Sequence, residues 1–262
     1  MRQDLCRQGE RNYDRVMEIR YFNTLESTNN YCKLLDPKSV GEFTVICARQ
    51  QTAGIGQQGS VWAAEPYKNL TFSLILKPTF LAAEEQYRLT MAIALAIAES
   101  IDEVFSKFTT HNSTSIKWPN DIYVGDKKIC GTLITNQISG SNLSQSICGI
   151  GLNVNQTKFP DWVPNPTSLK LLTGENYQLD TILNTILTNI EKEYTQLKHN
   201  DNNIEVQYVN RLYRLNVEAG YIYQNQTIRA TITGINRFGH LQLNTADGEH
   251  INCALKEIKF VI

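Results

Sequence analysis

A glycine-rich segment, TAGIGQQGSVW over residues 52–62, lies between two strand-like runs with no helical pattern between them. Its G-x-G-x-x-G spacing is typical of dinucleotide-binding units, in which the glycines lead from a strand into a helix. The run before it, FTVICAR at 43–49, and the run after it, LTFSLILKP at 70–78, both have strand character. We therefore exclude a dinucleotide-binding unit and expect the segment to join two neighbouring strands. It either wraps a polar ligand with its backbone N–H groups or is a surface loop without one.

Length and charge limit the class of protein. The 262 residues suffice for one large domain, or for a large and a small one. The 25 Lys and Arg nearly balance the 26 Asp and Glu, so no basic field indicates nucleic-acid binding. No apolar run is long enough for a membrane span or a signal peptide. We predict a cytoplasmic protein without a nucleic-acid or membrane partner.

The cysteines do not form a metal-binding or disulfide pattern. They are scattered, with no C-x-x-C pair and no histidine cluster near them. We expect most of them to be small buried apolar residues in a reducing compartment. The six positions are Cys6, Cys32, Cys47, Cys130, Cys148 and Cys253.

The N-terminal part predicts a disordered extension over residues 1–15, a strand over 16–22 and then a short helix. The polar run Ser27, Thr28 and Asn29 has the residue types that cap a helix N-terminus. The expected apolar stripe of that helix is Tyr31, Leu34 and Leu35. Capping is therefore the structural alternative for any functional role of the polar run.

The rest of the chain predicts an α/β domain followed by a small β domain. Apolar spacing of three and four residues predicts core helices over 87–105, 179–197 and 204–215. From residue 217 onward, short alternating strands with Gly-containing turns indicate a small β-barrel. The expected domains are a mixed-sheet catalytic or binding domain over 16–216 and a barrel over 217–262.

Four polar clusters follow predicted strands, where ligands of α/β sheets usually bind. They are Ser27 to Asn29, Gln51 with the glycine-rich segment, Lys117 to Asp121, and Lys128 running on to GIGLNVN. None contains a Ser-His-Asp or Cys-His set, and all four histidines lie elsewhere. Lysines, backbone donors and one carboxylate are what nucleotidyl transfer requires, so adenylation fits. Each residue also has a purely structural alternative.

In their order and spacing, STN, QQTAGIGQQGSVW, KWPND, KKICGTL and GIGLNVN strongly resemble the motifs of the biotin protein ligases. The resemblance runs from about residue 16 to the end. KWPND followed by Lys-x-x-Gly is the specific part. It implies a catalytic domain like that of class II synthetases and a C-terminal barrel like a Src-homology-3 domain.

The resemblance implies that biotin and magnesium ATP react to biotinyl-5'-adenylate, which a lysine of a biotin carboxyl carrier protein then captures. The residues that would bind biotin are Ser27, Thr28, Asn29, Gln51, Gly54, Ile55, Gly56, Gln57, Lys128 and Gly131. Those that would bind ATP are Trp62, Lys117, Asn120, Asp121 and Asn153. Lys128 and Lys117 would be catalytic, and Asp121 would help to hold Mg²⁺.

The chain departs from the family pattern in the glycine-rich segment, where the family usually has arginine and this chain has Ile55. The departure leaves the site without a cation that would be expected near phosphate. A smaller departure is Cys130 in place of the commoner alanine. The chain before STN is also too short for a DNA-reading domain, so we expect a ligase without repressor function.

Three alternatives stay open on sequence grounds. The nearest is a lipoate or octanoate ligase or transferase of the same fold. The second is a catalytically weak biotin-binding protein, suggested by Ile55. A flavin or nicotinamide oxidoreductase is disfavoured by the strand that follows the glycines. Homodimerisation through a sheet edge is a further option that the sequence leaves open.

Overall fold

The computed structural model describes residues 17–108 and 112–262, so the extension predicted for residues 1–15 and Cys6 lie outside the described residues. The chain divides into two compact units. The first consists of Met1–Ala83 and Lys127–Thr185, and the second of Glu84–Asp126 and Ile186–Ile262. Helix α4 (Leu179–Lys198) begins in the first unit and ends in the second.

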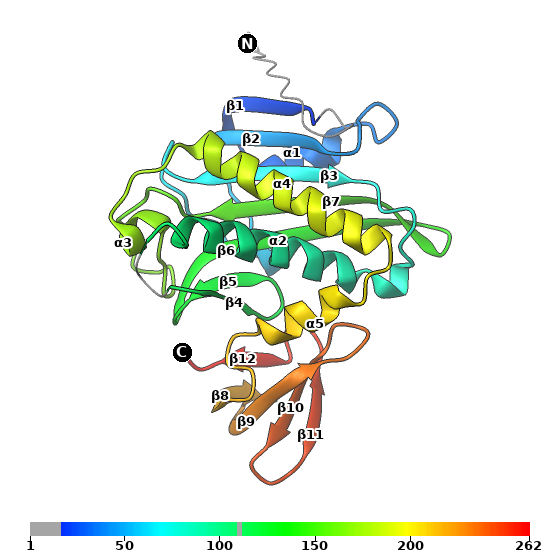
Figure 1. The fold of residues 1–262 in the computed structure, drawn as a ribbon, viewed down its shortest axis with the longest axis vertical. Coiled ribbons are helices and arrows are strands. Elements are labelled where there is room, and N and C mark those ends of the chain that lie inside the picture. Colours follow the sequence, from blue (N-terminus) through cyan, green and yellow to red (C-terminus); the bar gives the residue numbers. More distant parts are fainter. Residues whose placement is uncertain (1–16, 109–111) are drawn as a thin grey trace. The chain divides into compact units, whose positions relative to one another are not determined.

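The first unit contains strands of a mixed sheet in the order β1-β2-β3-β7-β6 (Figure 1). Strand β1 runs parallel to β2, and the other neighbouring pairs in this run are antiparallel. The predicted mixed sheet is thus confirmed. Since β2 and β3 are antiparallel neighbours, the glycine-rich segment joins adjacent strands, as predicted. The elements are β1 (Ile19–Leu25), α1 (Thr28–Leu34), β2 (Thr44–Gln51), the 3-10 turn η1 (Gln57–Gly59), β3 (Leu70–Leu76), β6 (Lys127–Ser139), β7 (Asn142–Leu152) and α3 (Leu169–Thr173).

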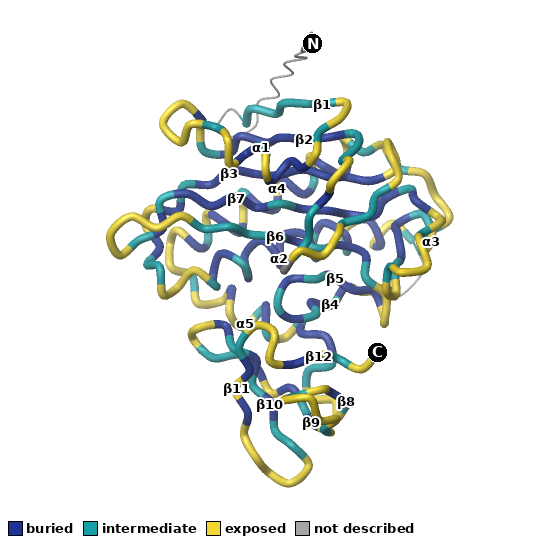
Figure 2. The backbone as a smooth tube through the Cα atoms, turned by 180° about the vertical axis from the view of Figure 1, so that it is seen from behind, coloured by how far each residue is buried: buried dark blue, intermediate teal, exposed yellow. Residues whose placement is uncertain are grey.

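Burial follows the position of each strand in this sheet. Strand β3 is buried along its whole length (Figure 2). It lies between β2 and β7, and α1 packs against it. Strand β1 begins and ends later than the strand predicted over 16–22. Its pairing with β2 places Ile19 opposite Val45 and Leu25 opposite Gln51, and this pairing sets its limits.

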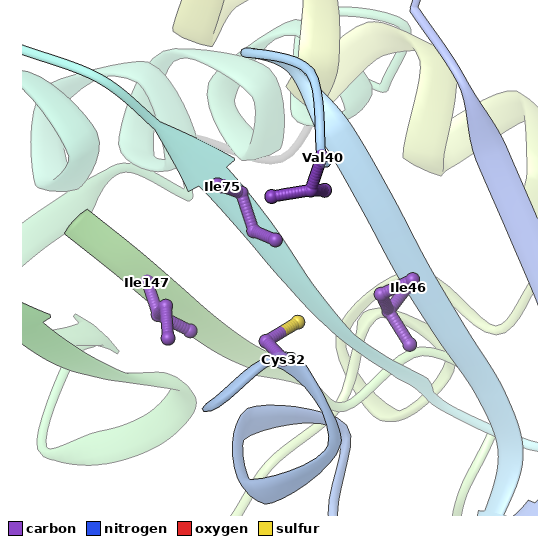
Figure 3. Close-up of a cluster of buried hydrophobic side chains, with 5 residues drawn as sticks. All are labelled: Cys32, Val40, Ile46, Ile75 and Ile147. Carbon is purple, nitrogen blue, oxygen red and sulfur yellow. The ribbon is translucent and has the colours of Figure 1, made fainter. Parts of the chain in front are cut away.

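Helix α1 packs against β2, β3 and β7. Its Cys32 thiol points into an apolar cluster formed with these strands (Figure 3). Burial raises the pKa of Cys32 to about 12, so the thiol stays protonated. The members of the cluster are Cys32, Val40, Ile46, Ile75 and Ile147.

The apolar stripe predicted for this helix is wrong at Leu34, which is 85% exposed. The buried residues of α1 are instead Thr28, Asn29 and Cys32. Thr28 and Cys32 are one turn apart and share a face, so Leu34, two residues further on, lies on the opposite side. The inward face of α1 therefore presents polar side chains at its N-terminal end.

The second unit contains a long core helix, α2, which packs against α5, β4 and β5. The predicted apolar face of α2 is confirmed, with Met91, Leu95 and Ile101 buried. Helix α5 ends at Asn210, before the predicted limit of 215, because the following backbone pairs with Ile116 of β4. The elements are η2 (Ala83–Glu85, which begins on the last residue of the first unit's first segment), α2 (Tyr87–Phe105), β4 (Thr114–Lys117), β5 (Asp121–Val124) and α5 (Asn203–Asn210).

The same unit ends in a five-stranded antiparallel sheet with the order β11-β10-β9-β8-β12. Alternate residues of its strands are buried, such as Ala230 and Ile232 on β9 and Leu241 and Leu243 on β10. The predicted small β structure is therefore present, and the domain boundary at residue 216 stays a prediction. None of the helices among the described residues is both long and apolar enough to cross a membrane. The strands are β8 (Glu218–Tyr223), β9 (Gln226–Ile235), β10 (Leu241–Thr245), β11 (His250–Cys253) and β12 (Ile258–Phe260).

Candidate functional site

Three glycines form a flat patch, here called the glycine floor, on the face of the sheet toward α1. Gly149 and Gly151 alternate along β7, and Gly131 on β6 pairs directly with Gly151. The indole of Trp62 covers part of this floor. A Cβ at residue 151 would lie 2.3 Å from Cε2 of that ring, and a Cβ at residue 131 would lie 3.1 Å from Cζ3. Position 151 must therefore be glycine, because any side chain there would overlap the Trp62 ring.

Gln51, at the end of β2, holds the beginning of α1. Its Oε1 accepts hydrogen bonds from the backbone N–H of Thr28 at 2.7 Å and from Oγ1 of Thr28 at 3.1 Å. The hydroxyl of Ser73 on β3 donates to Oγ1 of Thr28 at 2.9 Å. With its carbonyl oxygen occupied in this way, Gln51 directs its amide nitrogen toward Gly54, where a Cβ would be only 3.2 Å away.

Ser27 and Asn29 have different structural roles. Ser27 is the N-cap of α1, and its Oγ accepts from the backbone N–H of Asn30 at 3.3 Å, so the capping prediction is correct for this residue. Asn29 instead reaches toward the sheet, where its Nδ2 donates to the carbonyl of Leu133 at 3.1 Å. A Cβ at Gly149 would lie 2.6 Å from that nitrogen. Asn29 therefore lies directly over the glycine floor.

The glycine-rich segment forms a short hairpin. The backbone N–H of Gly56 donates to the carbonyl of Ser60 at 2.7 Å, and that of Trp62 donates to the carbonyl of Gly54 at 2.9 Å. A Cβ at Gly54 would be 2.6 Å from the Trp62 carbonyl oxygen, so the close approach of the two hairpin strands requires glycine there. The hairpin fixes the backbone that places the Trp62 ring on the floor.

Lys128 lies near the start of β6, and the segment over residues 165–167 fixes its backbone. Its N–H donates to the carbonyl of Asn165 at 2.7 Å, and its carbonyl accepts from the N–H of Thr167 at 2.9 Å. The Nζ atom lies 5.7 Å from the ring centroid of Trp62. It is also 3.1 Å from the point where a Cβ at Gly131 would lie. The ammonium group therefore lies at the glycine floor.

Asn153 follows β7 and is tied to the same segment. Its Nδ2 donates to the carbonyl of Thr167 at 2.9 Å, and its backbone N–H donates to the carbonyl of Ile129 at 2.9 Å. The residue is 4% exposed. Thr167 therefore links the backbone of Lys128 to the side chain of Asn153.

Three buried polar atoms near the floor have no hydrogen-bond partner among the described residues: Oδ1 of Asn29, Nε1 of Trp62 and Oδ1 of Asn153. Buried polar groups are normally satisfied, and leaving one unpaired costs about 1–3 kcal/mol. Two acceptors and one donor beside the same glycines indicate a ligand that carries both N–H and oxygen groups.

An open groove of about 490 Å³ lies beside the hairpin. Its walls include Gln51 and Trp62, so the groove borders residues that organise the floor. It gives a small molecule room to enter this part of the first unit. The lining residues are Gln51, Thr52, Gly54, Val61, Trp62, Ala63, Ala64, Glu65, Gln156, Lys158, Phe159 and Pro160.

The remaining predicted site residues lie in the second unit, at the turn between β4 and β5. Lys117 ends β4 and pairs with Asp121, the first residue of β5. Asn120, between them, is 3% exposed. The turn is held by Tyr208, whose hydroxyl donates to the carbonyl of Pro119 at 2.8 Å. A cation, an amide and a carboxylate are thus brought together on one short hairpin.

A family model described as the Biotin/lipoate A/B protein ligase family matches residues 21–153. That range includes α1, the glycine-rich hairpin, the β4–β5 turn, Lys128 and the glycine floor. The chain belongs to the biotin/lipoate protein ligase family.

Curated relatives lie on the biotin side of this ligase family. The chain is 31% identical over 232 residues to "Bifunctional ligase/repressor BirA" of Bacillus subtilis (strain 168), covering 87% of this chain and 70% of that protein. It is 26% identical over 165 residues to "Biotin--[acetyl-CoA-carboxylase] ligase" of Mycobacterium tuberculosis (strain ATCC 25618 / H37Rv), covering 63% and 59%. The resemblance to biotin protein ligases drawn from the motifs is confirmed.

Solved structures show the same fold. The biotin protein ligase from Aquifex aeolicus in complex with biotin and ATP superposes with a TM-score of 0.77 at 24% identity. The match covers 93% of this chain and 99% of that one. The arrangement of helices and strands in this ligase-family chain is thus shared with a biotin protein ligase.

Most predicted site residues of this ligase-family chain belong to the first unit, and the structure gathers several of them at the glycine floor. Ile55 and Gln57 are half-buried in the hairpin. Lys117, Asn120 and Asp121 form a separate group on the β4–β5 turn of the second unit. The first-unit residues are Ser27, Thr28, Asn29, Gln51, Gly54, Ile55, Gly56, Gln57, Trp62, Lys128, Gly131 and Asn153.

Sequence reasoning missed Ser73 and Thr167, and it gave no role to Gly149 and Gly151 although both lie in the GIGLNVN motif. The two glycines had a readable signal, because residues two apart on a strand share a face. Ser73 and Thr167 had none, since their bonds to Thr28 and Asn153 are made across the fold. The expected burial of the cysteines is confirmed for all five described ones.

Proposed function

We propose that this protein is an ATP-dependent biotin protein ligase, which activates biotin as biotinyl-5'-adenylate and transfers the biotinyl group to a lysine of a biotin carboxyl carrier protein. The observation that carries the proposal is the set of unpartnered buried polar atoms on Asn29, Trp62 and Asn153 beside the glycine floor. Because the chain belongs to a family of biotin and lipoate ligases, biotin is the ligand that we expect these atoms to bind.

Biotin fits the chemistry of the floor. It is an apolar bicycle with a ureido group that offers two N–H donors and one carbonyl acceptor, and it needs an apolar surface with a few fixed polar partners. The floor supplies backbone and indole surface. Oδ1 of Asn29 would accept a ureido N–H, and the amide nitrogen of Gln51 would donate to the ureido oxygen. Ser27 and Thr28 would shape the pocket wall.

In the first step, a carboxylate oxygen of biotin attacks the α-phosphorus of ATP. The bond from that phosphorus to the oxygen bridging to the β-phosphate breaks, and pyrophosphate leaves with the electron pair. The ammonium of Lys128 would stabilise the charge that develops on the α-phosphate oxygens. The backbone at Ile55, Gly56 and Gln57 would close over the valeryl chain and the carboxylate, and Gly131 would admit the valeryl chain close to the strand.

In the second step, the neutral amine of the carrier lysine attacks the acyl carbon of the adenylate. The bond from that carbon to the phosphate oxygen breaks, AMP leaves, and the nitrogen loses one proton to solvent as the amide forms. The hairpin would limit the access of water to the anhydride before the carrier arrives.

In the first unit, Trp62 and Asn153 would line the nucleotide side of the site. In the second unit, Lys117 and Asn120 would serve phosphates, with Asp121 at the metal. Magnesium usually combines one or two carboxylates with substrate phosphates and water. Among the described residues no group of three or more His, Cys, Asp or Glu could hold a metal alone. The single carboxylate of Asp121 therefore fits an ion that arrives with ATP. When bound, Mg²⁺ would neutralise phosphate charge.

We extend the proposal to the class of each domain and to the cellular location of the protein. The five-stranded sheet after residue 217 would be a barrel like a Src-homology-3 domain, and the domain over 16–216 would be related to class II synthetases. The protein would act in the cytoplasm, without binding nucleic acid or membranes, and a homodimer through a sheet edge is compatible with this role.

Incubation of the pure protein with biotin, magnesium ATP and a biotin carrier domain tests the function. We expect pyrophosphate release together with a carrier that is heavier by one biotinyl group. A carrier whose acceptor lysine is replaced by arginine is the matched control and should gain no mass. Lipoate in place of biotin should give neither signal. Carrier labelled only with lipoate would contradict the proposal.

Ile55 favours one second candidate, a biotin-binding protein with weak turnover, because the usual cation of the hairpin is missing at this position. In that case, biotin would bind and stabilise the protein, but pyrophosphate release would stay at the level of a control without enzyme. The same incubation separates the two functions.

A further inference from the structure

Within the second unit, the side chain of Lys117 lies over two aromatic rings. Its Nζ is 4.6 Å from the ring centroid of Phe260 and 5.5 Å from that of Tyr123. Phe260 is the last residue of β12, at the edge of the small C-terminal sheet. A cation above an aromatic face is attracted by the negative potential of that face. The C-terminal sheet thus touches a residue of the KWPND motif.

The Phe260 ring is itself held in place by other rings. Phe260 pairs with Tyr221 across β12 and β8, and their rings meet edge to face at 5.2 Å. Tyr213 lies 6.2 Å from Phe260 and 5.3 Å from Tyr123, and its hydroxyl donates to Asp126 at 2.6 Å. Because neighbours fix its orientation, Phe260 can act as a rigid platform rather than a mobile contact.

The residue after Lys117 is tied to the same C-terminal sheet. The indole N–H of Trp118 donates to the carbonyl of Gly239, in the turn between β9 and β10, at 2.8 Å in a buried setting. Gly239 has a φ of +81°, and a Cβ there would lie 2.1 Å from Cγ of Tyr87. The C-terminal sheet therefore contacts the KWPND segment at two consecutive residues, Lys117 and Trp118.

The next residue of the motif is fixed by two tyrosines. The carbonyl of Pro119 accepts from the hydroxyls of Tyr208 at 2.8 Å and Tyr87 at 3.2 Å, and these hydroxyls are 2.7 Å apart. Burial raises the pKa of both tyrosines, so both stay protonated and can donate. These two hydrogen bonds fix the backbone that follows Lys117.

We propose that Phe260 is a positioning residue for ATP binding, which holds the ammonium of Lys117 over its ring and so orders it for the nucleotide phosphates. The inference rests on the proposed function to the extent that Lys117 binds ATP. A lysine side chain has several rotatable bonds and loses their freedom when it binds a phosphate. An aromatic platform orders that side chain before the nucleotide arrives, which favours binding.

The test compares two substitutions that differ in aromatic character. Phe260→Leu keeps an apolar side chain but removes the ring face, and Phe260→Tyr keeps the face. We expect Phe260→Leu to weaken ATP binding, measured by calorimetry without biotin, by about fivefold. The KM for ATP should rise by the same factor, with the KM for biotin nearly unchanged. Phe260→Tyr should behave as wild type.

Two controls separate positioning from a structural effect. Phe238→Leu makes the same substitution in the turn between β9 and β10, at a ring that is 46% exposed, and should leave ATP binding unchanged. In a Lys117→Met background, Phe260→Leu should weaken ATP binding no further, because the cation that it positions is gone. Equal effects of Phe260→Leu with and without Lys117 would overturn the proposal.

The outcomes distinguish this inference from the proposed function. Carrier biotinylation by the wild type, with ATP affinity unaffected by Phe260→Leu, would overturn the positioning role and leave the ligase function intact. Coupling between Lys117 and Phe260 in ATP binding, without biotin transfer, would support the positioning role and contradict the ligase function. Loss of ATP binding in Phe260→Tyr would also overturn the positioning role of Phe260, because that variant keeps the ring face.

Discussion

Gly131 and Gly151 lie directly opposite each other on β6 and β7, and the indole of Trp62 covers both. Each glycine leaves its strand without a side chain at the same point, so the pair creates a flat backbone surface inside an otherwise apolar sheet. Lys128 borders this surface from the β6 side. The pairing of Gly131 with Gly151 thus determines where the Trp62 ring can lie.

A methyl group at position 151 should displace the Trp62 ring. For Gly151→Ala we expect a Kd for biotin raised by about tenfold or more, because overpacking of this kind costs about 1–3 kcal/mol. Biotin titration by calorimetry measures the change. Gly41→Ala is the matched control, since a Cβ there makes only an ordinary contact with Thr44 at 3.7 Å. Unchanged biotin affinity in Gly151→Ala would argue against the glycine floor as the binding surface.

Removal of the Lys128 ammonium should abolish adenylate formation while the protein still folds. Lys128→Met should slow biotin-dependent pyrophosphate release by about 10²- to 10³-fold, the usual effect of losing one group that stabilises transition-state charge. The neighbouring Lys127→Met removes an exposed charge and should retain the wild-type rate. Similar rates for the two variants would contradict the role assigned to Lys128.

A cation restored to the hairpin should retain the adenylate for longer. Ile55 is half-buried and its backbone pairs with Val61, so a longer side chain can extend outward without breaking the hairpin. We expect Ile55→Arg to slow the loss of biotinyl-adenylate by about fivefold, which corresponds to one charge-assisted contact of about 1 kcal/mol. Ile55→Met has similar length without the charge. If both variants match wild type, the backbone alone holds the adenylate.

Glu193 on α4 should make the stability of the protein depend on pH. It is 1% exposed, its Oε1 lies 3.3 Å from the ammonium of Lys192, and burial raises its pKa in spite of that cation. The folded protein therefore keeps this proton to higher pH than the unfolded chain does. The contribution of Glu193 to stability is complete below the unfolded pKa of about 4.3 and is lost as the pH rises through the folded pKa.

We expect Glu193→Gln to raise the free energy of unfolding at pH 7 by an amount on the order of 1 kcal/mol, and to have little effect near pH 4. The exposed Lys192 keeps a second partner, Glu99 at 3.0 Å, so the substitution does not isolate its charge. Urea unfolding at the two pH values measures the difference, and exposed Glu249→Gln is the control. A destabilised Glu193→Gln at pH 7 would contradict this interpretation.

Local patterns predicted the elements whose periodicity is strong. The core helix α2 has the expected buried face, and β2 and β3 are neighbours because no crossover segment separates them. Helix α1 is too short for its pattern to be decisive, so the burial of Cys32 and the exposure of Leu34 depend on how the helix packs on the sheet. The end of α5 depends likewise on pairing with Ile116.

For the site, the residue types and their order in the chain were enough to indicate adenylation chemistry and the family, because charge, amide groups and glycine spacing are local properties of the sequence. The fold alone determined which of these residues meet. Thr28 is oriented by Gln51 and Ser73, and Lys128 and Asn153 share Thr167, through hydrogen bonds between distant segments. Such partners have no sequence signal, since strand register and helix packing, which are cooperative properties of the whole sheet, bring them together.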